Sequence, residues 1–411
     1  MNLSLNQKPQ NIILKDAISH PEISLLLCCS QTRLDNAIEK QINSLVQQDI
    51  DWDYLITLAS RHGVLPLLFN SLNNICPKAI PKEVLSNLRS FSQKNIQRNL
   101  LLTNQLLKIL EIFRVNGIDA VPFKGPMLAA SVYGNLAYRQ FSDLDILVHK
   151  KDFLKAKQLL LCNQYQIHLS KMEEIFLSNH AFQTSFQHLN GMSNIDLHWG
   201  IAPRKPRLHS RFDCLWSNLE SVSIAGKSVL SFSPESTLVI QCINATKEAH
   251  RQLLKQNCDI NEIIQKYPNL SWDTVLHQAQ QLGCRRLVLI GLHVTQKLYG
   301  TILPDQIMKN IASLPIIKQL SEELKQRFFW DADELEKNFA KSYFINKHNF
   351  QTTELRDRIP YLIDKIITPH AEDRQFVSLP PSLYYLYYLI RPIRLIGQSK
   401  VLLKPRLPLK K

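Results

Sequence analysis

Two aspartates, Asp143 and Asp145, stand at the start of the apolar run Ile146-Leu147-Val148, and they constrain this chain more than any other feature. The apolar run predicts a short buried strand. Side chains two positions apart on a strand point to the same face, so both carboxylates should project together from an apolar element. Two carboxylates this close repel each other, and one resists ionisation unless a cation is shared.

A divalent metal ion would relieve this repulsion, since Mg²⁺ prefers carboxylate oxygens together with substrate phosphates. The alternative interpretation is a pair of solvated turn carboxylates at the mouth of an ordinary strand. An Asp-x-Asp pattern is common, so the choice depends on the neighbouring segments.

The segment before the acid pair has the pattern of an anion-binding turn. Residues 118–123 read as a strand, Lys124-Gly125 follows, and Pro126 opens a helix. Proline is favourable at the first helical position, and glycine lets backbone amides approach a ligand closely. Helix N-termini attract anions. The alternative is a plain strand-to-helix turn.

A third acid follows on another predicted strand. Ile195, Leu197 and Trp199 alternate with Asp196 and His198, which places the two polar side chains on one face. That face could equally be the exposed side of an antiparallel strand. A phosphate turn, an acid pair and a third acid are what metal-assisted nucleotidyl transfer requires, because the ions hold the triphosphate and an acid can accept the proton of an attacking hydroxyl.

These motifs resemble the uncharacterised nucleotidyltransferase-like family of the polymerase-beta-type superfamily. The resemblance rests on Phe123 to Gly125, Leu128 to Gly134, Arg139 to Val148 and Asp196 to Trp199. Outside this core, further matching segments are 25–29 with Leu34-Asp35, Asp51-Trp52, 59–63, Lys247 to Asp259, Leu379-Pro380, Tyr387 and 391–395. The resemblance therefore covers the chain from about residue 22 to about residue 396.

The resemblance implies roles for particular residues. Asp143, Asp145 and Asp196 correspond to metal-binding acids, and Lys124 and Gly125 to phosphate contacts, with Mg²⁺ or Mn²⁺ as cofactor and a nucleoside triphosphate as substrate. The wider superfamily usually has serine after the glycine and a shorter spacing to the acid pair, whereas this chain has Pro126.

Two further basic sites are candidate nucleotide contacts. Arg139 precedes the acid pair by four residues, and it either binds a phosphate or anchors the turn by bonding Asp143. Lys247, Arg251 and Lys255 have helical spacing, so one helix face would carry all three. That face either lines the cleft opposite the acids, where it would hold a triphosphate or an anionic acceptor, or is simply solvated.

The C-terminal end is basic and aromatic. Half of the formal net charge of +14 lies in residues 391–411, which contain no acid. Such a tail binds nucleic acid, an anionic membrane or an acidic partner, or is a solvated terminus. The preceding segment Leu383–Ile390 is amphipathic and aromatic, and it predicts a terminal helix packed on the protein in preference to one lying on a membrane or a partner.

Several other classes of protein are excluded. The eight cysteines form no Cys-x-x-Cys pair, and the chain has neither the Gly-x-Ser-x-Gly pattern of hydrolases nor the His-Glu-x-x-His pattern of zinc proteases. Residues 1–20 lack the apolar stretch of a signal peptide, and no apolar run approaches the roughly 20 residues of a spanning helix. We therefore expect a cytoplasmic protein with free thiols.

The predicted fold is α+β, a small mixed β-sheet core flanked by mainly helical N- and C-terminal regions. Only 11 glycines, with many Leu, Ile, Gln and Asn, favour a mainly helical chain. The expected parts are a helical region at 1–100, the nucleotidyltransferase-like core at 101–232, a helical domain at 233–375 and the tail at 376–411. Helices are expected at 24–29, 52–61, 65–72, 84–91, 99–115, 153–162, 234–242 and 285–298. Strands are expected at 165–169, 181–188 and 194–199, with a basic loop at 203–211 and a hairpin of 222–224 with 229–232.

The predicted function is Mg²⁺-dependent transfer of a nucleoside monophosphate to a hydroxyl of an unknown acceptor, which is a small molecule, a peptide or a protein. One alternative is a catalytically silent accessory protein of a biosynthetic pathway, which the missing serine favours. Another is a nucleotidyl transferase acting on nucleic acid; the basic tail favours it, but the chain has no aromatic-and-basic recognition pattern.

Overall fold

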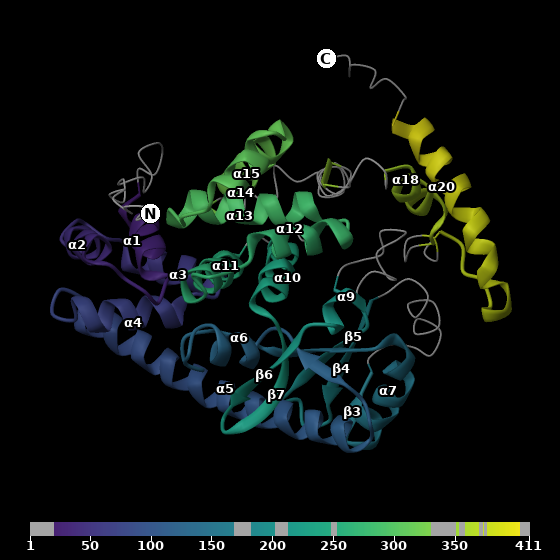
Figure 1. The fold of residues 1–411 in the computed structure, drawn as a ribbon, viewed down its shortest axis with the longest axis horizontal. Coiled ribbons are helices and arrows are strands. Elements are labelled where there is room, and N and C mark those ends of the chain that lie inside the picture. Colours follow the sequence, from purple (N-terminus) through teal and green to yellow (C-terminus); the bar gives the residue numbers. More distant parts are fainter. Residues whose placement is uncertain are drawn as a thin grey trace, which may run out of the picture.

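A computed structural model describes residues 20–167, 182–201, 213–247, 253–329, 351–352, 358–369, 373 and 376–402. It contains a small mixed sheet, and helical regions precede and follow this sheet along the chain (Figure 1). The predicted α+β class is therefore confirmed. The predicted basic loop at 203–211 and Arg251 lie outside the described residues.

The N-terminal helices are α1 (Pro21–Cys29), α2 (Asn36–Leu45), α3 (Trp52–His62) and α4 (Leu65–Ile75). Their ends follow from short-range chemistry. The Asp35 carboxylate accepts hydrogen bonds from two backbone amides at the start of α2, and Asp51 does the same for one amide of α3. Gly63, with φ of 68°, ends α3 in the left-handed conformation that favours glycine.

Helix α5 (Lys82–Val115) joins the helical part to the sheet. The sequence predicted two helices here, but the structure has one helix of 34 residues, because no glycine or proline interrupts the segment. At 1.5 Å per residue it is about 50 Å long. It therefore runs past residue 100, where the sequence placed a boundary, and extends along the lower edge of the molecule (Figure 1).

The main sheet has the strand order β1-β2-β5-β4-β3. Strand β2 (Asp143–Val148) pairs parallel with β5 (Asn194–His198), and the other neighbours are antiparallel. The remaining strands are β1 (Ala120–Pro122), β3 (Tyr165–Gln166) and β4 (Gln183–His188). A separate hairpin of β6 (Leu219–Ile224) and β7 (Lys227–Phe232) turns at Ala225 and Gly226, both with positive φ, as in a type I′ turn.

Alternation along the strands divides the sheet into two faces. On β2, Leu144, Ile146 and Val148 pack into a core with the second half of α5 and with α7 (Phe153–Cys162). Ile195 and Leu197 of β5 join that same core. The intervening residues of both strands therefore point to the opposite face, where Leu147 belongs to the helical core.

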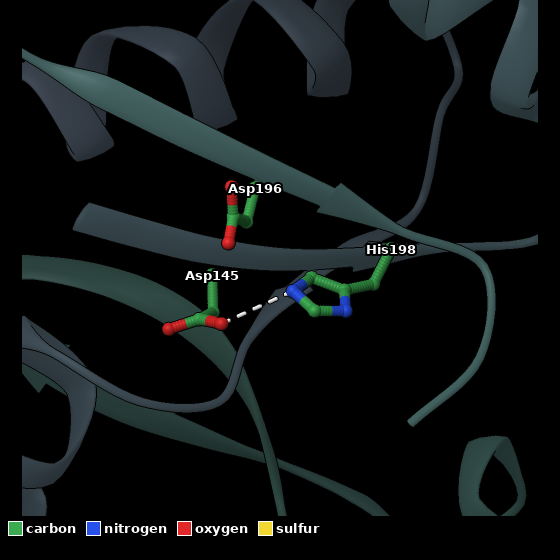
Figure 2. A group of neighbouring side chains, drawn as sticks. All are labelled: Asp145, Asp196 and His198. Atoms are coloured by element: carbon green, nitrogen blue, oxygen red, sulfur yellow. Dashed lines mark hydrogen bonds and ion pairs between the residues drawn. The ribbon is translucent and has the colours of Figure 1, made fainter. Parts of the chain in front are cut away.

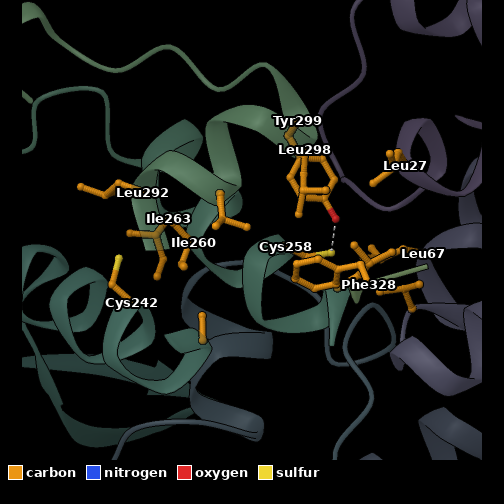
Figure 3. Close-up of a cluster of buried hydrophobic side chains, with 14 of the residues drawn as sticks. Leu27, Leu67, Cys242, Cys258, Ile260, Ile263, Leu292, Leu298, Tyr299 and Phe328 are labelled. Carbon is orange, nitrogen blue, oxygen red and sulfur yellow. Dashed lines mark hydrogen bonds between the residues drawn. The ribbon is translucent and has the colours of Figure 1, made fainter. Parts of the chain in front are cut away.

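The C-terminal helices share a core with the N-terminal ones. Leu27 and Leu67 belong to the same buried cluster as Ile260, Ile263 and Leu298 (Figure 3). The C-terminal helices in this shared core are α10 (Pro234–Lys247), α11 (Leu254–Lys266), α12 (Trp272–Gln281), α13 (Arg285–Tyr299), α14 (Asp305–Ala312) and α15 (Pro315–Arg327). The other described helices are α6 (Pro126–Ser131), η1 (Lys150–Asp152), α9 (Asp213–Trp216), α18 (Arg358–Ile367), η4 (Pro381–Leu386) and α20 (Tyr387–Leu402). Among the helices described, none is both long and apolar enough to span a bilayer.

The predicted terminal helix begins later than expected. Residues 381–386 form the 3-10 turn η4, and α20 continues from Tyr387, whose ring is buried. Arg391 and Arg394 bind Asp373 at 3.0 and 2.6 Å, so two of the basic residues of the tail form buried ion pairs. Tyr387, Arg391 and Arg394 thus lie on the buried side of this segment, and its other side is exposed.

His62 ties the two helical parts together and makes their stability depend on pH. Its Nδ1 accepts the Leu254 amide at 3.3 Å, and its ring lies 6.2 Å from that of Phe328. Burial, and then the Arg61 charge, lower the pKa of His62 from 6.5 to about 3. The unfolded chain therefore binds a proton below about pH 6.5 that the folded chain does not.

We expect His62 to cost stability as the pH falls from 7 to 5. Since one pKa unit corresponds to about 1.4 kcal/mol, the loss due to this residue at pH 5 is about 2 kcal/mol. Urea unfolding at both pH values measures it, and His62→Gln should shrink the loss by that amount. His277→Gln, at an exposed position of α12, is the matched control. An unchanged loss in His62→Gln would contradict the assignment.

Candidate active site

Strands β2 and β5 bring three acids to one face of the sheet. Asp143 and Asp145 lie two positions apart on β2 and share its polar face. In the parallel ladder Asp145 is the partner of Asp196, and Leu147 is the partner of His198. Partners in a ladder point to the same side, so the structure places Asp196 beside the acid pair, as the sequence predicted.

Asp145 is the centre of this cluster. Its Oδ1 accepts hydrogen bonds from Lys124 Nζ at 2.8 Å and from His198 Nε2 at 3.0 Å. Burial alone would raise the pKa of Asp145, but the Lys124 charge and the bond from His198 outweigh burial and hold that pKa well below its usual range. An ionised carboxylate only accepts, so Nε2 of His198 carries the proton. Within the described residues, no hydrogen bond ends on Oδ2 of Asp145.

Asp196 is oriented by β4. Its Oδ1 accepts from Ser185 Oγ at 2.6 Å, and its Oδ2 accepts from Gln183 Nε2 at 3.1 Å. Asp145, Asp196 and His198 converge from the two adjacent strands (Figure 2), and each offers a ligand atom within 4.8 Å of the others. The sequence placed His198 on the same strand face as Asp196 but did not name it as a candidate ligand.

Asp143 lies outside that group but within its electrostatic reach. Burial, and then repulsion from Asp145 and Asp196, raise the pKa of Asp143 above its usual range. No hydrogen bond of the described residues ends on its carboxylate. The repulsion predicted from the Asp-x-Asp pattern thus falls on Asp143, since Lys124 and His198 compensate its neighbour.

The turn at Lys124-Gly125 positions the lysine against the acids. Phe123 is tied to β2 by its amide, which donates to the Asp145 carbonyl at 3.3 Å, and to α10 by its own carbonyl, which accepts from Gln241 at 3.0 Å. Gly125 then adopts φ 50° and ψ −123°, a conformation that residues with a Cβ rarely occupy. A Cβ there would lie 3.3 Å from the Asp143 carbonyl oxygen.

Gly125→Ala should therefore destabilise the protein by about 1–3 kcal/mol, the usual cost of such a backbone conformation. The added methyl group would also press on the strand that carries the acids. Gly117→Ala is the matched control, since its φ is also positive (68°) but its Cβ meets open space. Equal unfolding midpoints for the two variants would show that the contact with Asp143 is not tight.

Arg139 has a partner that the sequence did not suggest. Its Nε and Nη2 donate to the two carboxylate oxygens of Asp259 on α11, both at 2.8 Å, and Tyr133 donates to the same carboxylate at 2.9 Å. Arg139 and Asp259 are 5% and 1% exposed. The expectation of a bond to Asp143 is wrong, because the buried carboxylate of α11 binds the guanidinium in a bidentate pair.

The predicted basic helix face does not exist as such. α10 ends at Lys247, and Leu253 is extended, with φ −117° and ψ 127°, before α11 begins at Leu254. Lys247 and Lys255 therefore stand on different helices. The side chain of Lys247 lies outside the described part of the chain.

Lys255 is the basic residue that the structure brings toward the acids. Its Nζ donates to the Gln140 carbonyl at 3.3 Å, and its charge lowers the pKa of Asp143. Burial, and then the Arg139 charge, lower the pKa of Lys255 itself. The site therefore has one lysine from the turn after β1 and another from α11. Only helical spacing hinted at Lys255, and that pattern gave no reason to separate it from Lys247.

A family model and a solved structure match this chain. A family model described as uncharacterised nucleotidyltransferase matches residues 48–300, which is more than half of the chain. A crystal structure of an antigenic nucleotidyltransferase-like protein from Paracoccidioides brasiliensis matches 51% of this chain and 95% of that one, with 17% identity and a TM-score of 0.31. No curated protein matches the chain.

The matched range contains the turn at Lys124-Gly125, both acids of β2, Asp196 and His198, and also the helix that carries Asp259 and Lys255. The chain belongs to the uncharacterised nucleotidyltransferase family.

Proposed function

We propose that this protein transfers a nucleoside monophosphate from a nucleoside triphosphate to a hydroxyl group, with Mg²⁺ or Mn²⁺ as cofactor. The hydroxyl oxygen bonds the α-phosphorus, the bond between the α- and β-phosphates breaks, and pyrophosphate leaves. Family membership supports a nucleotidyl-transfer role. The observation that carries the finer proposal is the convergence of ligand atoms of Asp145, Asp196 and His198 within 4.8 Å, with Asp143 on the same strand face.

The residues present fit a hard divalent cation. Carboxylate oxygens are the ligands that Mg²⁺ prefers, and three carboxylates share this face. Both compensating bonds to Asp145 end on Oδ1, which leaves Oδ2 for a ligand bond. Burial, and then repulsion from Asp145 and Asp196, keep the pKa of Asp143 raised despite the charges of Lys124 and Lys255. A bound cation would favour the ionised form of Asp143.

Each residue then has a distinct task. Asp143, Asp145 and Asp196 would hold the metal, which supplies charge stabilisation for the transferring phosphoryl group. The two bonds from β4 keep Asp196 oriented, and its carboxylate would accept the proton of the attacking hydroxyl. His198 holds Asp145 in place through its Nε2 proton.

Lys124 and Lys255 are the cations that would bind the triphosphate, with the amide at Gly125. Lys124 is 23% exposed and already close to the acids, so a phosphate could share its ammonium group with Asp145. Arg139 is left out of this set because its Nε and Nη2 bind Asp259 and its side chain is only 5% exposed. Lys247 stays a prediction from sequence.

A catalytically silent accessory protein is the second candidate. Pro126 stands where the wider superfamily usually has serine, and Lys124 already neutralises part of the acid cluster without a metal. Such a protein would bind nucleotide or a pathway partner and would need no divalent cation.

The acceptor that we propose is a small molecule, a peptide or a protein, with nucleic acid favoured less. All eight cysteines are free thiols, which fits a cytoplasmic setting.

Labelled triphosphates test the proposal directly. The purified protein is incubated with Mg²⁺, a cell extract and each triphosphate labelled either at the α- or the γ-phosphate. We expect the α label, and not the γ label, to appear in an acceptor, because the nucleoside monophosphate is the group transferred. The label should vanish with a chelator and with Asp143→Asn.

Asp119→Asn is the control for this experiment, because Asp119 is an exposed acid just before β1 and outside the site. Transfer of the γ label would instead indicate a kinase. Triphosphate binding that persists in the chelator and in Asp143→Asn, with no label transferred, would establish the accessory role.

A further inference from the structure

The two C-terminal helices α18 and α20 expose apolar stripes. On α18, Ile359, Ile363 and Ile366 are 70%, 51% and 48% exposed, and their spacing places them along one face of the helix. Figure 1 shows α18 and α20 next to each other at one side of the molecule. An amphipathic helix normally turns such a stripe toward a core, so this stripe needs a partner from outside the described chain.

Helix α20 has the same inverted arrangement. Leu389, Ile393 and Ile396 are 64%, 67% and 58% exposed, whereas the charged Arg391 and Arg394 are buried against Asp373. On α20, therefore, these two arginines are buried and these three aliphatic side chains are exposed.

The exposed apolar residues of this protein are concentrated here. Of the 22 large apolar side chains that are exposed in the described chain, 12 lie between residues 359 and 396. Scattered single residues need no explanation, but a concentration of this kind marks an interaction surface.

The charge of the following segment selects the partner. The segment from residue 391 to residue 411 contains no acid, and with Arg391 and Arg394 paired it still carries Lys400, Lys404, Arg406, Lys410 and Lys411. A second copy would bring the same positive charge to the contact and repel it. A bilayer with acidic lipids has an apolar interior and an anionic headgroup layer. It therefore complements both the exposed apolar side chains and the positive charge.

We propose that the exposed faces of α18 and α20 dock this protein on an anionic membrane surface. The helices lie in the interface rather than across it, because neither is a candidate for spanning the bilayer. The aliphatic side chains of α18 and α20 enter the acyl boundary, and the net positive charge of residues 391–411 favours acidic lipids. This proposal is independent of the proposed enzymatic function.

Vesicle flotation of the full-length protein tests this. We expect binding to phosphatidylcholine vesicles with about a third phosphatidylserine to exceed binding to pure phosphatidylcholine by roughly ten-fold or more, and to weaken between about 0.1 M and about 0.5 M salt. The double variant Leu389→Asp/Ile393→Asp should bind at least roughly ten-fold less. Ile359→Asp/Ile363→Asp provides a second, independent variant on α18.

Leu154→Asp/Ile302→Asp is the matched control, since these side chains are 68% and 83% exposed on other parts of the protein. It should bind vesicles like the original protein. Absence of binding, equal binding to both lipid compositions, or binding unaffected by either double variant would each overturn the proposal. A dimer that the same variants dissociate, with no vesicle binding, would identify the surface as a self-association face instead.

Discussion

Asp145→Asn is expected to abolish metal-dependent triphosphate binding, with a loss of affinity of at least roughly 100-fold in the presence of Mg²⁺. The asparagine oxygen can still accept from Lys124 and His198, so the local hydrogen bonds survive the change. The substitution does, however, remove the negative charge that would bind a cation. Titration calorimetry with a non-hydrolysable triphosphate analogue, with and without chelator, measures the effect.

Asp119→Asn should leave this binding unchanged, because Asp119 is exposed and lies outside the acid cluster. Unfolding midpoints of both variants verify that neither change acts through stability. If Asp145→Asn kept metal-dependent affinity within a few-fold of the original protein, the acid cluster would not be the metal site and the enzymatic proposal would fail.

Asp259→Ala should cause the largest loss of stability of any single change proposed for this protein, about 3–5 kcal/mol. Removing the carboxylate leaves Arg139 as an unpaired buried charge and also deprives Tyr133 of its acceptor. Arginine keeps its proton in proteins, so the guanidinium cannot escape this cost by becoming neutral. Urea unfolding measures the change in the free energy of unfolding.

The double variant Arg139→Met/Asp259→Leu should recover much of this loss, because apolar residues of similar size replace the whole pair. Arg114→Met is the surface control, since it breaks the exposed Arg114–Glu111 pair on α5 and should barely change the unfolding midpoint. A loss in Asp259→Ala no larger than in this control would show that the buried pair is not a stabilising link between α11 and the segment before β2.

The Asp145 and Asp259 experiments test two different roles, a metal ligand and a partner in a buried ion pair, which the sequence alone could not tell apart. Asp145 can be assigned to the site from its position two residues after Asp143 on an apolar strand, since alternation alone fixes the shared face. Asp259 carries no such local signal. It meets Arg139 only because α11 packs against the segment before β2, with 119 intervening residues between the two in the chain.

The same distinction holds for the remaining residues of the site. The pattern Asp196-Leu197-His198 predicted one polar strand face, but only the parallel pairing of β5 with β2 brought that face beside Asp145. Lys255 was placed on a helix with Lys247, and the extended Leu253 separates them. Whether a break occurs between two helical stretches depends on how each packs, and spacing does not contain that information.

The sequence by itself determined the elements and the chemistry: the strand that carries the acid pair, the turn at Gly125, the helix at 153–162 and the acidic character of the site. These follow from interactions between residues a few positions apart, which propensity and alternation describe. The tertiary structure alone decided which charges compensate which, through Lys124 and His198 on Asp145 and Asp259 on Arg139. Ion pairing depends on distance in space and on burial, and both are set by packing between segments far apart in the chain.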